Sequence, residues 1–300
     1  MKLATFTQSG RTRIGVVQDG GILDLSAAAP ALPTEMRSFL EAGAPALQAA
    51  RAAKGALIPL KDVYLEAPVL RPSKFLAIGL NYADHIAETK RETPQKQLWF
   101  NKQTTCVNAP YGQIHLPKVS TSLDYEGELG FVIGRKCRHV PKGRAHEVIA
   151  GFCIVNDVSV RDWQMHSQTM TMGKSFDTHG PFGPWIVTPD EVGDPHNLPI
   201  RTLLNGEVMQ DSNTKHLVFN CYDQIVYLTQ AFTLLPGDVI ATGTPGGVGF
   251  ARTPPVWLRE GDLVEVEVSG VGRIANRVVA DQPAPEGWPW RALAPDTTRF

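Results

Sequence analysis

The stretch Asp124-Tyr-Glu-Gly-Glu-Leu-Gly-Phe-Val-Ile-Gly134 decides the fold that we expect for this chain. Residues 129–133 are a continuous apolar run with β-branched and aromatic members, which is typical of a strand buried on both faces. Side chains two positions apart on a strand point to the same side. Glu126 and Glu128 therefore direct two carboxylates to one point at the mouth of this strand. Two such anions repel each other unless a cation or a shared proton relieves them.

A third carboxylate has a similar setting. Asp157 follows the apolar run 150–155, which we interpret as another strand that runs into a loop. Three hard oxygen ligands without clustered Cys or His favour Mg²⁺, Mn²⁺ or Ca²⁺ over Zn²⁺. The sequence therefore predicts a divalent-metal site at Glu126, Glu128 and Asp157.

The same Glu-x-Glu spacing recurs at Glu265 and Glu267, where we expect no function. Valines alternate with these glutamates in the run 263–268, which predicts a half-buried strand with a solvated charged face. The strand that follows Glu126 and Glu128 shows no polar face, and this difference separates the two pairs.

The composition is typical of a soluble globular protein with one large domain, or with one large domain and a small companion. The chain has 300 residues, of which 43% are hydrophobic and 20% are charged. Lys plus Arg number 29 and Asp plus Glu number 30, which argues against nucleic-acid or anionic-membrane partners. We expect neither a signal peptide nor a membrane span, because no long apolar core is present. The four scattered cysteines predict reduced thiols in a cytoplasmic protein.

We divide the chain into three parts. Residues 1–68 are predicted to form a small N-terminal α+β module, with a helix capped by Thr34 that stops near Gly43 and another over about 45–53. Residues 69–282 form the expected catalytic domain, with a further helix over about 217–232. Residues 283–300 are a C-terminal tail rich in Pro and Trp.

A His–Glu pair follows the apolar run 74–80. His85 and Glu88 are three positions apart, so on a helix capped by Asn81 or Asp84 they share a face. A carboxylate beside an imidazole fixes its tautomer and raises its basicity, which a general base requires. A surface ion pair is the alternative interpretation. The polar stretch 89–97 that follows resembles a mobile loop, which would let this helix close over a site.

Other candidate residues lie downstream. Gly173-Lys-Ser suggests a phosphate loop, but position 168 is Gln where a glycine is required, so we reject a nucleotide site. Lys174 is either a buried cation facing the carboxylates or an exposed side chain. Arg161 is expected to pair structurally with Asp162 or another acid, and Gln164 could direct an amide at a substrate. The glycine-rich loop 242–249 offers backbone N–H groups that can hold an anion such as a carboxylate.

Taken in order, these segments resemble the fumarylacetoacetate hydrolase family, over about residues 70 to 280. The matching pieces are Gly79-Leu-Asn-Tyr-Ala-Asp-His85 with Glu88, Asp124-Tyr-Glu-Gly-Glu128, Asn156-Asp157, Arg161-Asp-Trp-Gln164, Gly173-Lys-Ser-Phe-Asp177, Asn205-Gly206 and Gly237-Asp-Val-Ile-Ala-Thr-Gly-Thr-Pro245.

The resemblance implies a β-rich, mixed α/β fold of curled sheets with flanking helices, and a homodimer. It implies Mg²⁺, or Mn²⁺ or Ca²⁺, as the cofactor. The implied site residues are the metal ligands Glu126, Glu128 and Asp157, and the water-activating dyad His85 and Glu88 on a lid. Lys174 is implied as a catalytic residue that contacts the substrate and stabilises developing charge, and the further substrate contacts are Gln164, Arg161 and Thr244. An additional metal-binding aspartate, which the family's first enzyme uses, has no counterpart that we can place in this sequence.

The resemblance also implies a small 2-keto acid substrate. We expect a metal-dependent hydrolase that cleaves a carbon–carbon bond in a 2,4-diketo acid of the acylpyruvate type, with water activated by His85 and Glu88. The same site would also suit a 2-oxo acid decarboxylase, a dienedioate isomerase or a ureidoglycolate-type lyase. A binding protein stabilised by a structural cation is the non-enzymatic alternative.

Overall fold

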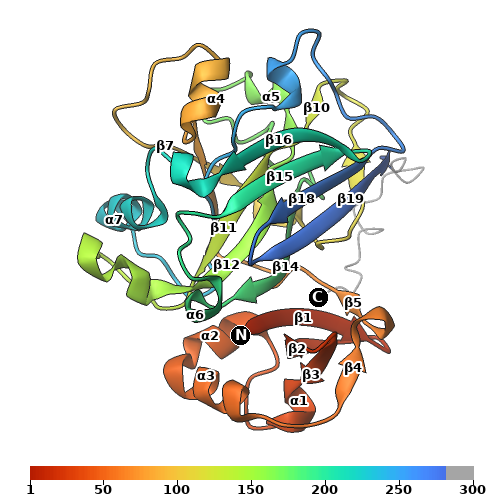
Figure 1. Ribbon diagram of the computed structural model, residues 1–300, viewed down its shortest axis with the longest axis vertical. Coiled ribbons are helices and arrows are strands. Elements are labelled where there is room, and N and C mark those ends of the chain that lie inside the picture. Colours follow the sequence, from red (N-terminus) through yellow and green to blue (C-terminus); the bar gives the residue numbers. More distant parts are fainter. Residues whose placement is uncertain (282–300) are drawn as a thin grey trace, which may run out of the picture.

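The structure is a computed structural model that describes residues 1–281, and strands dominate it (Figure 1). Within these residues, twelve strands form one large sheet, five form a second sheet and two form a short ribbon. Parallel and antiparallel pairs occur together in both large sheets. The β-rich mixed fold that the sequence predicts is therefore confirmed. The predicted tail 283–300 lies outside the described residues.

The strands of the large sheet follow the spatial order β4 (Leu57–Pro59), β3 (Gly21–Asp24), β2 (Arg11–Gln18), β1 (Lys2–Gln8), β14 (Gly180–Val187), β12 (Ile149–Asn156), β11 (Gly127–Ile133), β17 (Val239–Ala241), β6 (Phe75–Gly79) and β7 (Leu98–Lys102). Two short strands pair with members of this sheet, β5 (Tyr64–Leu65) with β1 and β8 (Val107–Asn108) with β14. The second sheet has the order β16 (Glu207–Asn213), β15 (Pro199–Leu204), β18 (Leu263–Val268), β19 (Gly272–Ala280) and β9 (Ile114–Leu116). The ribbon pairs β10 (Leu123–Asp124) with β13 (Ser159–Val160).

The helices are short and occur in the segments of the chain that connect the strands. The α-helices are α1 (Leu25–Ala28), α2 (Met36–Glu41), α3 (Gly43–Ala52), α4 (Ala83–Glu88), α5 (Arg161–Gln164), α6 (Pro189–Val192) and α7 (Cys221–Ala231). The 3₁₀ turns are η1 (Leu60–Asp62), η2 (Thr104–Cys106), η3 (Lys142–Val148), η4 (Thr214–His216) and η5 (Gly249–Ala251). No helix among the described residues is both long and apolar enough to cross a bilayer.

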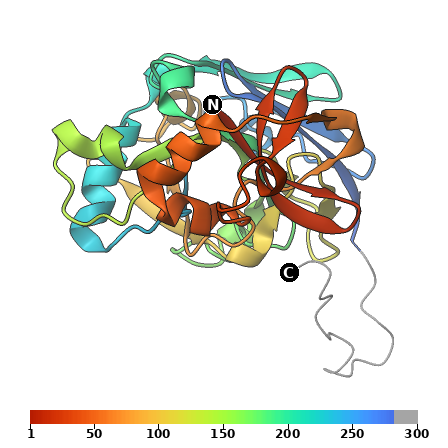
Figure 2. The ribbon, with the colours of Figure 1, turned by 90° about the horizontal axis from the view of Figure 1, so that it is seen from below.

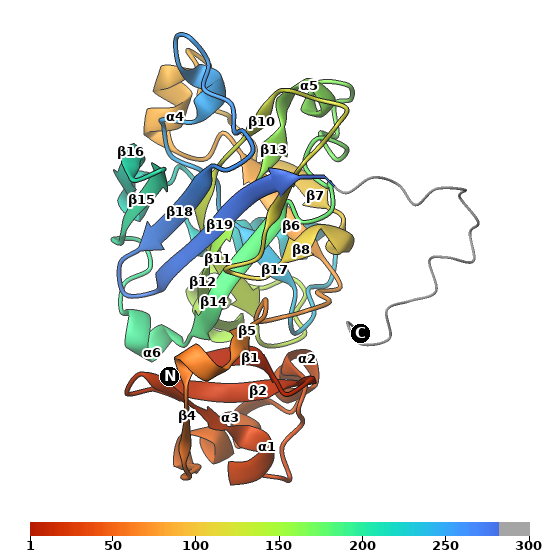
Figure 3. The same ribbon diagram turned by 90° about the vertical axis from the view of Figure 1, so that its right-hand side faces the viewer.

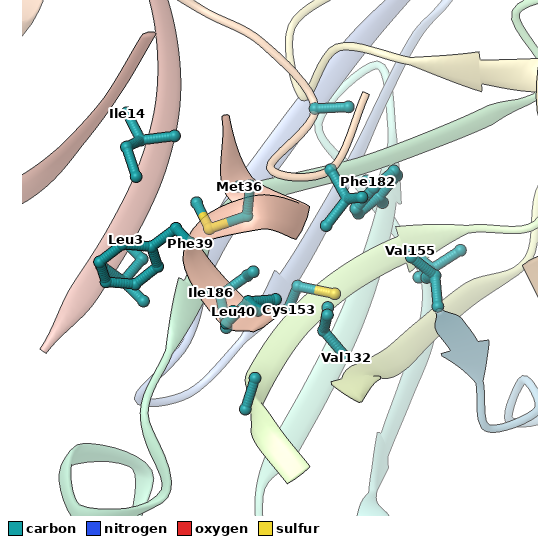
Figure 4. Packing of buried hydrophobic residues seen from close by; sticks show 14 of the residues in the cluster. Leu3, Ile14, Met36, Phe39, Leu40, Val132, Cys153, Val155, Phe182 and Ile186 are labelled. Carbon is teal, nitrogen blue, oxygen red and sulfur yellow. The ribbon is translucent and has the colours of Figure 1, made fainter. Parts of the chain in front are cut away.

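The N-terminal module extends the large sheet. Strand β1 pairs antiparallel with β14, with Lys2 opposite Val187. Seen from below, the helices α2 and α3 lie on one side of the module and its strands on the other (Figure 2). The helix α2 packs against the large sheet, with Phe39 and Leu40 on the helix side and Cys153 on the sheet side (Figure 4). These contacts give the module an apolar boundary with the rest of the chain.

Strand β11 is buried along its whole length, as its unbroken apolar run predicts. Its side chains alternate between two cores. Phe131 belongs to the core that the second sheet covers, and Val132 belongs to the core that includes α2. Because both faces are covered, neither face needs polar residues.

Three helix boundaries differ from the prediction. The helix expected over about 217–232 begins at Cys221, because Asn220 accepts hydrogen bonds from the backbone N–H groups of Tyr222 and Asp223. In the module, Glu35 rather than Thr34 caps α2. The following helix α3 begins at Gly43, where the first helix was expected to stop.

The expectation of a solvated charged face on β18 is wrong for Glu265, which is only 6% exposed. Strand β18 lies inside the second sheet, between β15 and β19. Arg273 on β19 forms an ion pair with Glu265 and lies 3.7 Å from Glu267. The cross-strand arginine therefore covers the face that was expected to be open.

The pairing of β11 with β12 places the predicted metal ligands at one end of the large sheet. The two strands are antiparallel, with Gly127 opposite Asn156. Glu126, immediately before one strand, and Asp157, immediately after the other, therefore lie at the same end. The helices α4 and α5 lie at the end of the molecule opposite the N-terminal module (Figures 1 and 3).

Candidate active site and metal centre

Three carboxylates meet where β11 begins and β12 ends. The backbone N–H of Asp157 donates to the carbonyl of Glu126 over 2.8 Å, which joins the two strand ends directly. One oxygen from each of Glu126, Glu128 and Asp157 lies within 4.8 Å of the other two, and all three residues are buried. The structure thus brings together the three residues that the sequence analysis proposes as metal ligands.

Glu128 is the carboxylate of the cluster for which the described part of the chain supplies no cationic partner. It is 1% exposed, and one of its oxygens accepts a hydrogen bond from the backbone N–H of Gly243 over 2.7 Å. Within residues 1–281 the ion pairs of the cluster reach Glu126 and Asp157 but not Glu128. Burial raises the pKa of Glu128 well above its usual range, and the neighbouring Asp157 and Glu126 raise it further.

Two buried lysines neutralise part of the cluster. The Nζ atom of Lys174 lies 2.7 Å from Glu126 Oε2 and 2.9 Å from Asp157 Oδ2. Lys174 is 2% exposed, so of the two alternatives that the sequence left open it takes the buried one. Lys102 lies 2.6 Å from the other oxygen of Asp157. Burial by itself would lower the pKa of Lys102, but the carboxylate of Asp157 outweighs it and raises this pKa.

Arg161 pairs with two acids other than its sequence neighbour. Its Nη1 atom lies 2.6 Å from Glu126 Oε1, and its Nη2 atom lies 2.7 Å from Asp124 Oδ2. Asp162 instead accepts a hydrogen bond from Ser120. Burial by itself would raise the pKa of Glu126, but Arg161 and Lys174 outweigh it and hold this pKa at about 2. Arg161 therefore keeps Glu126 ionised.

Arg161 also forms a hydrogen bond with the side chain of Gln164. The Nη1 atom of Arg161 donates to Gln164 Oε1 over 3.0 Å, and the amide nitrogen of Gln164 faces the sulfur of Met170 at 3.4 Å. The carbonyl end of this amide is thus engaged by the protein. Substrate contacts from Gln164 and Arg161 stay predictions.

The donor set fits a divalent cation. Four buried carboxylates face three buried cations in this cluster, which leaves one negative charge when all seven groups are ionised; they are Asp124, Glu126, Glu128 and Asp157 against Lys102, Lys174 and Arg161. A divalent cation beside Glu128 would change the net charge of the cluster from −1 to +1 and would offset the cost of burying that carboxylate without a partner. Buried oxygen donors without sulfur or imidazole suit Mg²⁺ or Mn²⁺.

The His–Glu pair forms beside this cluster. His85 Nδ1 lies 2.8 Å from Glu88 Oε1 on α4, with side-chain exposures of 13% and 26%. The pair is therefore more enclosed than a solvated surface pair. The pair is joined to the cluster through the loop after β17, whose backbone N–H groups donate from Gly247 to Glu88 and from Gly243 to Glu128. Because Glu88 accepts from Nδ1, the Nε2 atom stays available for proton transfer.

The backbone N–H groups of the glycine-rich loop after β17 bind anions, as predicted. These anions are carboxylate side chains of the protein itself. Its backbone N–H groups donate from Gly243 to Glu128, from Gly246 to Asp84, from Gly247 to Glu88, and from Gly249 and Phe250 to Asp124. Gly247 has φ +100°, and a side chain there would collide with the carbonyl of Met209. Only glycine fits that position.

Thr244 is engaged within the same network. Its hydroxyl donates to the carbonyl of Gly127 over 3.0 Å and accepts from Gln210 Nε2 over 2.8 Å. The hydroxyl proton is therefore already used in this structure. A contact between Thr244 and the acid end of a substrate stays a prediction.

Sequence reasoning missed Lys102, Gln210 and the role of Asp124. Lys102 is the last residue of β7, a segment to which the sequence analysis assigned no role. Asp124 opens the motif around which the chain was interpreted, but it was given no role. No local signal marks Gln210, which is 83 positions from the residue it contacts, Gly127.

Comparisons with known proteins indicate the family of this chain. The family described as "Fumarylacetoacetate (FAA) hydrolase C-terminal" matches residues 74–279. "Oxaloacetate tautomerase Fahd2a, mitochondrial" of Rattus norvegicus is 46% identical over 264 residues, which cover 87% of this chain and 84% of that protein. The name of this relative does not support the expected cytoplasmic location, which stays a prediction, as does the homodimer.

Two solved structures are also similar. Fumarylacetoacetate hydrolase from Exiguobacterium antarcticum has a TM-score of 0.82 and 35% identity, and the match covers 94% of this chain and 100% of that one. Maleylpyruvate hydrolase from Sphingobium sp. SYK-6, solved with manganese(II) and pyruvate, has a TM-score of 0.76 and 33% identity at the same coverage. Sequence, fold and family match agree, and the chain belongs to the fumarylacetoacetate hydrolase family of enzymes.

Proposed function

We propose that this protein interconverts the keto and enol forms of a small 2-oxo dicarboxylic acid of the oxaloacetate kind, with a divalent metal. The observation that carries the proposal is the buried carboxylate of Glu128 beside Glu126 and Asp157, for which residues 1–281 supply no ion-pair partner. The glycine-rich loop that binds Glu128 also binds Glu88 of the His85–Glu88 pair. Relatives that are 42% to 46% identical to this chain are named oxaloacetate tautomerases, and their names support this substrate class.

The metal site supplies electrophilic chemistry. A divalent metal bound by Glu126, Glu128 and Asp157 would polarise the 2-keto group and stabilise negative charge on its oxygen. Lys174 uses two of its three protons on Glu126 and Asp157. Its third proton leaves this ammonium able to donate to an oxygen that becomes negative.

His85 moves the proton. In the keto-to-enol direction its Nε2 atom takes a proton from C3 of the substrate, and the electron pair of that bond forms the double bond between C2 and C3. The 2-oxygen takes up a proton from solvent, and His85 releases its own to solvent in exchange. Glu88 holds Nδ1 over 2.8 Å and stabilises the transient imidazolium. The substrate gains and loses no atoms.

Acylpyruvate hydrolysis is the second candidate, supported by the likeness to the maleylpyruvate hydrolase that was solved with manganese and pyruvate. In that reaction His85 would deprotonate water, which attacks the 4-keto carbon, and the bond between C3 and C4 would break to release pyruvate. The two candidate reactions use the same residues. They differ in the group that His85 deprotonates, which is C3 of the substrate in tautomerisation and water in hydrolysis.

One assay distinguishes them. Purified protein with Mn²⁺ is mixed with the enol of oxaloacetate, and the loss of enol absorbance is compared with the spontaneous rate; acylpyruvates are tested in parallel for pyruvate. We expect faster tautomerisation, reduced about a hundredfold or more in His85→Ala. His146→Ala is the control, since His146 is exposed and lies in η3.

Cleavage of acylpyruvates without acceleration of tautomerisation would replace the first candidate with the second. If neither substrate responds with metal present, both candidates are wrong.

A further inference from the structure

Asp84 connects the helix that carries His85 to both sheets of the molecule. It occupies the first turn of α4, immediately before His85. Its Oδ2 atom accepts a hydrogen bond from Ser212 Oγ over 2.6 Å, and Ser212 belongs to β16 of the second sheet. Its Oδ1 atom accepts from the backbone N–H of Gly246 over 3.3 Å, in the loop after β17 of the large sheet.

The other end of α4 is attached to the same loop. Glu88 Oε2 accepts from the backbone N–H of Gly247 over 2.7 Å, while Glu88 Oε1 faces His85. Two carboxylates one helical turn apart thus bind two consecutive glycines of the loop. His85 lies between them, so its position relative to the metal ligands is set by both attachments.

The segment before the helix is also attached: the buried side chain of Asn81 donates to the carbonyls of Phe219 and Thr242 and accepts from the backbone N–H of Phe219. The helix itself is short. It has six residues, and of these only Ile86 is buried. Tyr82, at its N-cap, makes no side-chain hydrogen bond to the helix. A single helix of this length is unstable in water without tertiary contacts. Asn81 therefore fixes the start of the helix, while the contacts that Asp84, Glu88 and Ile86 make with other elements hold the turn that carries His85.

A purely local role for Asp84 accounts for only part of this geometry. An acidic residue in the first turn interacts favourably with the helix dipole, and Asp84 Oδ1 accepts from the backbone N–H of His85 over 2.8 Å. That role requires no partner on another element. Ser212 lies 128 positions away and is bound at a distance typical of a charge-assisted hydrogen bond.

We infer that Asp84 is a positioning residue, which together with Ser212 holds α4 and its His85 over the carboxylate cluster. The inference rests on the proposed function for the chemistry that His85 performs. The attachment of the helix does not depend on that chemistry, and it can be measured without a substrate.

The test uses Asp84→Ala, Ser212→Ala, the double variant, and Ser212→Thr, which keeps the hydroxyl. Hydrogen exchange of the amides of residues 83–89 is measured in each protein, with thermal stability and Mn²⁺ affinity. We expect exchange at α4 to rise about tenfold in Ser212→Ala and by more in Asp84→Ala, which also removes the acceptor for Gly246 and His85. The double variant should exchange like Asp84→Ala, because the bond between Asp84 and Ser212 is already lost in each single variant. Ser212→Thr should exchange like the wild type.

Activity gives the second readout. With oxaloacetate we expect kcat to fall about tenfold in Asp84→Ala and Ser212→Ala, while Mn²⁺ affinity and the melting temperature stay close to those of the wild type. Glu92→Ala is the control, since it removes an exposed carboxylate from the segment after α4. It should change neither readout.

Unchanged exchange at α4 in Asp84→Ala overturns the inference, and so do additive effects of the two alanine substitutions. A fall in activity that follows the melting temperature also overturns it, because it shows a general loss of stability. If wild-type protein lacks tautomerase activity but exchange responds as expected, the positioning role stands and the proposed function fails.

Discussion

The side-chain oxygen of Gln210 accepts a hydrogen bond over 3.0 Å from the backbone N–H of Gly127, the residue between Glu126 and Glu128. The amide nitrogen of Gln210 donates to Thr244 Oγ1 and to the carbonyl of Pro245, each over 2.8 Å. One buried amide on the second sheet thus joins the backbone between the two glutamates to the glycine-rich loop.

Gln210→Leu should therefore weaken metal binding as well as the fold. Three buried polar groups lose a partner, and we expect the free energy of unfolding to fall by about 2 to 3 kcal/mol. Because Gly127 is no longer fixed, Mn²⁺ affinity should fall about tenfold. Calorimetric titration and denaturant unfolding measure the two effects.

Asn276→Leu is the matched control for this substitution. Asn276 is a buried amide in the same sheet whose nitrogen bonds three carbonyls, the shortest contact being 2.8 Å to Gly112. It should lower stability and leave Mn²⁺ affinity unchanged. Equal losses of affinity in both variants would show that Gln210 has no special role at the site.

Removal of the metal should destabilise the protein through Glu128. We expect Mn²⁺ at a hundred times its dissociation constant to stabilise wild-type protein by about 2.7 kcal/mol. Glu128→Gln should remove this effect and should be more stable than the wild type without metal, because it eliminates a buried carboxylate that has no cationic partner.

Thermal unfolding with and without EDTA checks the prediction for Glu128. Glu267→Gln is the control, since it alters the other Glu-x-Glu pair and should leave the response to Mn²⁺ intact. A Glu128→Gln protein that Mn²⁺ still stabilises fully would remove Glu128 from the set of ligands.

Lys102→Met should remove the cation that faces Asp157 Oδ1 in the interior of the protein. Loss of one partner of a buried ion pair costs about 3 to 5 kcal/mol, and we expect a loss of this size in metal-free protein. Bound Mn²⁺ should recover part of it, because a cation again faces Asp157. The measurement is urea unfolding with and without Mn²⁺.

Lys74→Met offers a comparison for this lysine. Lys74 lies 2.9 Å from the buried Asp238, on another part of the large sheet. Lys74→Met should also be less stable than the wild type. Mn²⁺ should stabilise this variant by no more than it stabilises the wild type. The role of Lys102 at the cluster is refuted if Mn²⁺ acts equally on both variants.

His179 should make the fold sensitive to acid. It is 1% exposed, and its Nε2 atom lies 2.8 Å from the carbonyl of His115. Its Nδ1 atom is buried and has no hydrogen-bond partner among residues 1–281. Burial lowers the pKa of His179 from 6.5 to about 3. Between these values the unfolded chain binds a proton that the folded protein does not, so the free energy of unfolding falls as the pH falls, by up to about 1.4 kcal/mol per pH unit.

His179→Phe should remove this contribution. Urea unfolding over the range from about pH 6 to about pH 4 should show a shallower loss of stability than in the wild type. His146→Phe, at an exposed position, should keep the wild-type slope. Parallel slopes in wild type and His179→Phe would contradict the prediction.

Local patterns in the sequence were sufficient for part of this structure. The run after Glu128 predicted a strand buried on both faces, and β11 is such a strand. This succeeded because burial on both faces requires apolar residues at consecutive positions, which a short stretch displays. The carboxylates at the start of that strand, Glu126 and Glu128, and the one just after β12, Asp157, were similarly visible.

Only the tertiary structure decided which groups surround those carboxylates. The antiparallel pairing of Gly127 with Asn156 brings Asp157 to the glutamates, and chain segments far apart deliver Lys102 and Gln210. Charges and amides acquire roles from burial and from partners at a few ångströms, and no periodicity records these. The amino acids alone therefore determined the strands and the oxygen donors, while packing decided that Glu128 would be the carboxylate without a cation.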